Sequence, residues 1–173
     1  MSFFNIFNKK RIVIDTESDL TPEEERKIEE NFETTKKWKE NSKQYKKYWT
    51  RHYEILEKVQ FDLYSKAINQ PNIFNKYSEM CINLCLEDLS LAPYLIEYWT
   101  KENEILNNGF TLPNFGSHKY LLKILEKQKR YDEAIMLCNQ YIELGLDNDG
   151  TKGGIKGRKE KFKKLILDSE KRK

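Results

Sequence analysis

The feature that most constrains this chain is a run of apolar and small residues that recur every three or four positions. The members of the run are Ile28, Phe32, Thr35, Trp38, Ser42, Tyr45, Trp49, His52, Leu56, Val59, Leu63 and Ala67. This spacing places side chains on one face of an α-helix, because a strand would alternate with a period of two. It predicts one long helix near the N-terminus, or two in series with a break near Asn41-Ser42. A stripe of this length also permits a coiled-coil homodimer.

The start of this helix is marked by Thr21-Pro22-Glu23-Glu24. Thr21 can cap the helix, Pro22 suits the first helical position, and Glu24 can complete a capping box. The residues before it, 1–20, are rich in Phe and then basic. Such a terminus either docks on the domain or stays flexible, and a membrane anchor would need a longer amphipathic stripe.

The rest of the chain also has helical patterns, and 7 Gly and 4 Pro in 173 residues supply few breakers. Further helices are predicted over residues 73–91, 93–106, 117–129, 131–144 and 157–170. The fold class is therefore all-α, with antiparallel helical hairpins in a single domain over residues 21–173. The last helix, 157–170, is basic.

The net charge of +3 is unevenly distributed along the chain. Segments 36–58 and 150–173 carry +5 and +7, whereas 1–35 and 59–149 carry −4 and −5. Two basic segments around an acidic centre are typical of solvated helix faces, and they also permit binding to nucleic acid.

Compartment and redox state follow from the cysteines and from the lack of a long apolar run. Cys81, Cys85 and Cys138 are an odd number, and the first two lie four apart on one helical face, where a disulfide has poor geometry. We expect small core residues in a reducing compartment. The N-terminus has no signal-peptide pattern and no stretch approaches the ~20 apolar residues of a membrane span, so the sequence predicts a cytoplasmic protein.

Two stretches share a pattern at an offset of 53 residues. MCINLCLEDLSLAP begins at Met80, and EAIMLCNQYIELGL begins at Glu133. Both contain a small residue, Ile, Cys, an aliphatic residue and Leu at matching positions. A repeated helix of this kind is typical of a stacked helical array.

The segment EKQKRYDEAIMLCNQYIELGL resembles the second half of a tetratricopeptide repeat (TPR). In that family, Ala134 would be the small residue that lets two helices approach closely, and Leu121 also fits. His118, Leu122, Leu125 and Cys138 depart from the pattern. The resemblance covers residues 117–146 well and 73–106 loosely, and the ending DGTKGG-x-x-GR is similar to that of some bacterial proteins with a single repeat. It implies a short TPR-like array of stacked hairpins behind the long N-terminal helix.

The glycine-rich stretch GLDNDGTKGGIKGR, residues 145–158, is the most enzyme-like phrase in the chain. A phosphate-binding loop would place Lys before Thr and would follow a buried strand, and neither condition holds. A calcium loop would run from Gly145 to Lys156, without the acidic residues needed at both ends. Two possibilities remain: a capped connection between helices, or a weak anion site at a helix start formed by Lys152, Lys156 and Arg158.

No other residues form a recognisable catalytic or metal-binding set. The two histidines, His52 and His118, have no partner cluster in the sequence, and Cys81-x-x-x-Cys85 lacks further zinc ligands. We expect no catalytic activity, no cofactor and no metal.

Two functions are therefore predicted. The first is a TPR-like protein–protein interaction scaffold. Since the first helix of each TPR pair lines a groove, Lys119, Tyr120, Lys123 and Lys127 are predicted to face a protein or peptide partner, which would be acidic. The alternative is a helical nucleic-acid-binding protein that uses segments 36–58 and 150–173.

Overall fold

A computed structural model of the chain describes residues 21–107 and 115–171. All regular structure in these ranges is helical, which confirms the predicted all-α class. The elements are α1 (Pro22–Lys58), η1 (Val59–Leu63), α2 (Tyr64–Ile68), α3 (Lys76–Ile105), α4 (Ser117–Lys127), α5 (Tyr131–Glu143) and α6 (Gly154–Glu170). The expectations for residues 1–20 lie outside the described ranges.

Helix α1 begins where the capping signal predicted. The backbone N–H of Glu24 donates to Thr21 Oγ1 at 3.3 Å, and the Thr21 N–H donates to Glu24 Oε2 at 2.8 Å. The helix passes Asn41-Ser42 without a break, because Asn41 is buried and its Nδ2 donates to the carbonyl of Tyr98 at 3.2 Å. It then continues through the π-helical turn η1 into α2.

Helix α3 corrects the prediction of two helices that meet at Pro93. It runs unbroken for 30 residues with Pro93 inside it, and it starts at Lys76 with Asn75 as its N-cap. A proline inside a helix removes one backbone hydrogen bond and disfavours the conformation. Here packing outweighs that cost, since Cys85, Ala92 and Leu95 on the same helix are fully buried. The first of the two matched stretches is thus part of one helix, not of a hairpin.

Helices α4 and α5 form an antiparallel pair joined by residues 128–130. Four apolar side chains of α4 are fully buried: Leu121, Leu122, Ile124 and Leu125. Ala134 is also fully buried in α5, as a close-contact position requires. The three cysteines are buried and unpaired, which confirms them as core residues.

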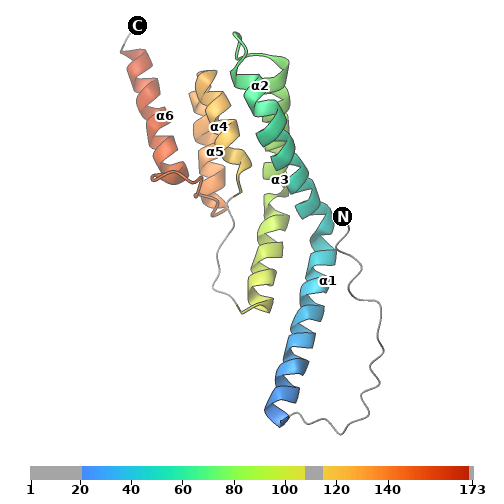
Figure 1. The fold of residues 1–173 in the computed structure, drawn as a ribbon. Coiled ribbons are helices and arrows are strands. Elements are labelled where there is room, and N and C mark those ends of the chain that lie inside the picture. The colour runs from blue at the N-terminus through green and yellow to red at the C-terminus, as the bar shows by residue number, and fades with distance from the viewer. Residues whose placement is uncertain (1–20, 108–114, 172–173) are drawn as a thin grey trace.

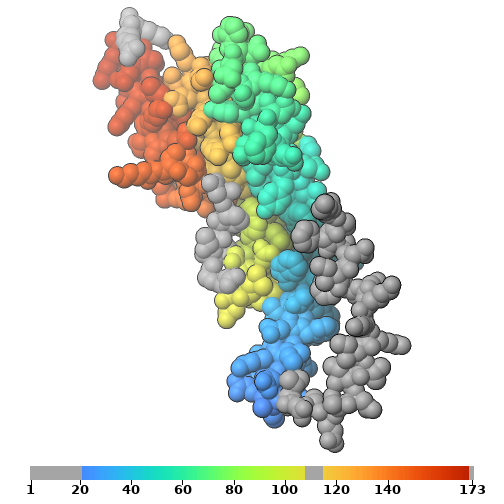
Figure 2. All heavy atoms as spheres, in the orientation of Figure 1, coloured from blue at the N-terminus to red at the C-terminus, as the bar shows by residue number. Residues whose placement is uncertain are grey.

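Consecutive long helices pack side by side and run in alternating directions (Figure 1). α6 begins at Gly154, three residues earlier than predicted, and anchors Ile155 and Phe162 in the core. The first turns of α1 extend beyond the helices that cover its second half (Figure 2). No helix within the described ranges has the length and apolar character needed to span a membrane.

Candidate functional site

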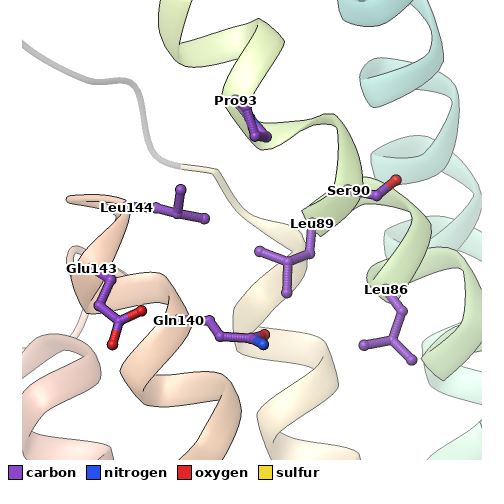
Figure 3. Close-up of a pocket in the computed structure, with 7 residues that line it drawn as sticks. All are labelled: Leu86, Leu89, Ser90, Pro93, Gln140, Glu143 and Leu144. Carbon is purple, nitrogen blue, oxygen red and sulfur yellow. The ribbon is translucent and has the colours of Figure 1, made fainter.

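A groove runs between α3 and α5 on the surface of the molecule (Figure 3). It has a volume of about 470 Å³. Its lining consists of Leu86, Leu89, Ser90 and Pro93 from α3, Gln140 and Glu143 from α5, and Leu144 at the C-cap of α5. Figure 3 shows the side chains of Leu89 and Leu144 pointing toward each other across it. The two stretches that match at an offset of 53 residues therefore form the two walls of one groove.

A second hollow, of about 260 Å³, continues this groove along the same two helices. The two hollows share Leu86 and Gln140, and Leu121 and Leu125 of α4 contribute to the lining of the second. The combined surface, which we call the α3/α5 groove, thus has two helical walls with α4 beneath part of it. Three successive helices therefore position it.

The chemistry of the α3/α5 groove suits apolar side chains. Leu86 is 41% exposed and Met136 is 62% exposed, although both are large apolar residues. Among its polar groups, Arg130 and Glu133 of the second hollow pair with each other at 2.6 Å, and Ser90, Gln140 and Glu143 line the larger hollow. Within residues 21–107 and 115–171, no three His, Cys, Asp or Glu side chains are grouped so as to hold a metal ion.

The predicted face on α4 is only partly present. Lys123 and Lys127 are exposed, and Lys119 is half-buried. Tyr120 is buried, which corrects its prediction as an exposed contact residue. Its ring lies 4.8 Å from that of Tyr64, because η1 and α2 cover a side of α4 that the sequence pattern left open. The Lys119 ammonium lies 4.8 Å from the same Tyr120 ring.

The glycine-rich stretch forms a structured connection between α5 and α6. Asp149 is buried and pairs with Arg158, while Lys156 lies 3.3 Å from Asp147. Burial alone would raise the pKa of Asp149, but hydrogen bonds from Thr151 and Arg158 hold that pKa below its usual value. Two of the three predicted anion-binding residues, Lys156 and Arg158, therefore have carboxylate partners, whereas Lys152 is exposed and has no ion pair with a described residue.

His118 attaches this connection to the core. Its Nε2 donates to the carbonyl of Asn148 at 3.2 Å, and burial lowers its pKa to about 4. The imidazole is therefore neutral near pH 7. Its Nδ1 is buried and has no hydrogen-bond partner among the described residues.

A buried pair between α1 and α3 was missed by the sequence analysis. His52 Nδ1 lies 2.7 Å from Asp88 Oδ1, and both side chains are almost completely buried. A signal for it was available. Asp88 lies on the same helical face as Cys85 and Ala92, and a carboxylate on an apolar face requires a buried partner.

Comparisons with protein-family models, with curated proteins and with solved structures found no match for this chain.

Proposed function

We propose that this chain is a TPR-like protein–protein interaction scaffold without catalytic activity, and that the α3/α5 groove binds its partner. The groove supports this proposal because it is open, mostly apolar, and has no acid–base or nucleophilic set at its walls. Large apolar side chains exposed at such a surface are typical of a binding site.

The arrangement of the helices supports the TPR-like part of the proposal. α3 and α5 share the groove, whereas α2 packs on α4, and α6 packs along α5 and also reaches α4. Specifically, Tyr64 of α2 packs on Tyr120, and Lys161 of α6 pairs with Glu126 at 2.6 Å. Each helix from α3 to α6 thus packs on the next one along the chain, as helices do in stacked helical hairpins.

The shape of the groove favours an amphipathic helix as the partner. A helix laid along α3 and α5 would present apolar residues three and four positions apart, in the helix-in-groove mode of recognition. The larger hollow would receive one such side chain between Leu89 and Leu144, and Leu86 and Met136 would contact the next turn. Glu143 and Gln140 would meet polar groups at the edge of that helix.

The nucleic-acid alternative has less support. The basic segments 36–58 and 150–173 lie mainly on α1 and α6, with α4 and α5 between them (Figure 1). Several of their cations also have carboxylate partners, such as Arg51 with Glu87 at 2.7 Å. A continuous basic surface, which nucleic-acid binding normally requires, is therefore not formed by these two segments.

The proposal is tested by comparing partners captured by the wild type and by the variant Leu86→Glu with Met136→Glu. Both positions are exposed, so the fold should persist. Affinity for a partner should fall tenfold or more, on the order of the loss of one interface anchor. The control is Leu167→Glu on α6, an exposed apolar residue outside the groove.

Capture is measured by mass spectrometry at two salt concentrations, with and without nuclease. A partner retained by the groove variant and by the control alike would contradict the proposed site. Loss of all capture after nuclease treatment would favour the nucleic-acid alternative instead.

A further inference from the structure

The first turns of α1 form an arm that extends beyond the rest of the described molecule (Figure 1). Trp38 Nε1 donates to Glu102 Oε1 of α3 at 2.8 Å, near the end of α3 at Ile105. The residues before Trp38, 22–37, are all exposed except for a half-buried Thr34. At 1.5 Å per residue, this α1 arm is ~25 Å long.

The α1 arm carries apolar side chains that no other described residue covers. Ile28 is 55% exposed, Phe32 is 67% exposed, and Trp38 at the base of the arm is 38% exposed. They belong to the same helical stripe whose later members pack on α3. A helix with an uncovered apolar stripe is stabilised when another surface covers that stripe.

The charges along α1 indicate what that surface is. Residues 22–33 contain six Glu against two basic residues, whereas residues 36–47 contain six Lys against one Glu. All six lysines are exposed. The sign of the charge therefore reverses within α1, close to Thr34 and Thr35.

We propose that two copies of this chain associate through the α1 arm, with the two α1 helices antiparallel. In this arrangement the acidic segment 22–33 of each copy lies along the exposed lysine side of segment 36–47 of the other, beside the part of the stripe that α3 covers. Parallel arms would instead place like charges together, which is destabilising. The charge pattern thus favours the antiparallel orientation over the parallel one.

The antiparallel arrangement also pairs the exposed aromatic residues. If the two helices cross near Thr35, Phe32 of each copy lies beside Trp38 of the other. The Phe32–Trp38 pair is then formed twice by symmetry, as in an isologous interface. Glu29 comes near Lys43 in the same register. This surface is separate from the α3/α5 groove, so the two proposals stand or fall independently.

The first test is the molar mass of the full chain in solution by sedimentation equilibrium. We expect twice the chain mass at ~0.05 M salt and weaker association at ~0.5 M, because exposed charges are screened. Phe32→Glu should give the mass of a single chain with unchanged helicity. Its control is Phe61→Glu, since Phe61 is 75% exposed on η1, outside the arm, and should leave the dimer intact.

The second test exchanges the charges. Glu29→Lys with Glu33→Lys should weaken association strongly, and so should Lys39→Glu with Lys43→Glu, because each variant gives positions 29 and 33 the same charge as positions 39 and 43 of the other copy. An equimolar mixture of the two variants should recover the dimer mass.

Three results would overturn the proposal. The first is a wild-type chain that has the mass of one copy at every concentration and at low salt. The second is an equal effect of Phe32→Glu and Phe61→Glu. The third is a mixture of the charge variants that stays monomeric. A monomeric full chain that dimerises only after removal of residues 1–20 would identify those residues as the occupant of the arm instead.

Discussion

His52 and Asp88 meet in the core where α1 packs on α3, with 2.7 Å between Nδ1 and Oδ1. The rings of Trp99 and Phe115 pack around the imidazole, with centroids 5.9 and 4.9 Å away. Asp88 Oδ2 has no hydrogen-bond partner among the described residues. A buried polar pair in such surroundings fixes the register of the two helices, since any other alignment would leave both groups without a partner.

Asp88→Ala should therefore destabilise the fold by about 1–3 kcal/mol, because it leaves the buried His52 N–H without an acceptor. Urea unfolding of Asp88→Ala, His52→Ala and the double variant completes a cycle. We expect a coupling of about 0.5–3 kcal/mol between the two positions. Strictly additive losses would show that the pair contributes no mutual stabilisation.

The buried His118 predicts a loss of stability in mild acid. Its pKa is about 4 in the folded chain, below the ordinary 6.5, because burial disfavours the imidazolium. The unfolded chain therefore binds more protons between pH 6.5 and 4. Stability is full above pH 6.5 and falls as the pH drops, by up to ~3 kcal/mol at pH 4.

This dependence is measured as the free energy of unfolding from pH 7 to pH 5, above the range in which most carboxylates titrate. His118→Gln retains an N–H donor for the Asn148 carbonyl but does not titrate. It should flatten the pH profile even if it lowers stability overall. A profile with the same slope in wild type and variant would assign the pH dependence to other groups.

At the scale of the elements, two glycines at the start of α6 have opposite roles. Gly154 has φ +55°, and a Cβ on it would lie 2.4 Å from the carbonyl oxygen of Asp147. The neighbouring Ile155 N–H donates to that same oxygen at 2.8 Å. Gly157, one turn later, has no atom near its Cβ position. Only the first glycine is required by the backbone.

Gly154→Ala should thus destabilise the chain by about 1–3 kcal/mol, through a strained backbone and a steric clash. Gly157→Ala should stabilise it by about 0.5–1 kcal/mol, because alanine favours the helix. Thermal unfolding of both variants measures the contrast. Equal effects of the two substitutions would mean that residues 147–154 are not held as a fixed connection.

The elements also show how far sequence patterns reach. Apolar spacing and caps predicted most helices to within a few residues, since both signals are local. The sequence predicts a helix start at Pro93, because the unfavourable effect of a proline inside a helix is visible in the local sequence. The burial of Cys85 and Leu95, which offsets that effect, depends on tertiary packing and is not visible there. Tyr120 was placed on the surface for the same reason, because its cover by Tyr64 comes from a distant part of the chain. The α3/α5 groove could not be predicted from the sequence, because its prediction requires knowing that α3 and α5 are neighbours in space.

At the scale of the whole molecule, the remaining surface to test is the exposed side of α4. Lys123 and Lys127 lie there, on the face opposite the α3/α5 groove, and they are basic residues in a segment that is acidic overall. Attraction of an acidic partner to them would be local rather than an effect of net charge. Lys119 is a poorer probe, because it also contacts the Tyr120 ring.

Lys123→Glu with Lys127→Glu should leave the fold intact, since exposed substitutions usually cost under ~0.5 kcal/mol. If the partner also contacts this face with acidic groups, the variant should associate more slowly and with altered salt dependence. The matched control, Lys164→Glu with Lys171→Glu, makes the same change in net charge on α6 and its C-cap. Binding kinetics with a captured partner separate the outcomes.

A slower association rate for the α4 variant alone locates the contact on α4. A larger loss of binding for the α6 control indicates the basic C-terminal segment and nucleic acid. Unchanged rates for both would exclude either lysine face from the interface and leave the groove as the binding surface.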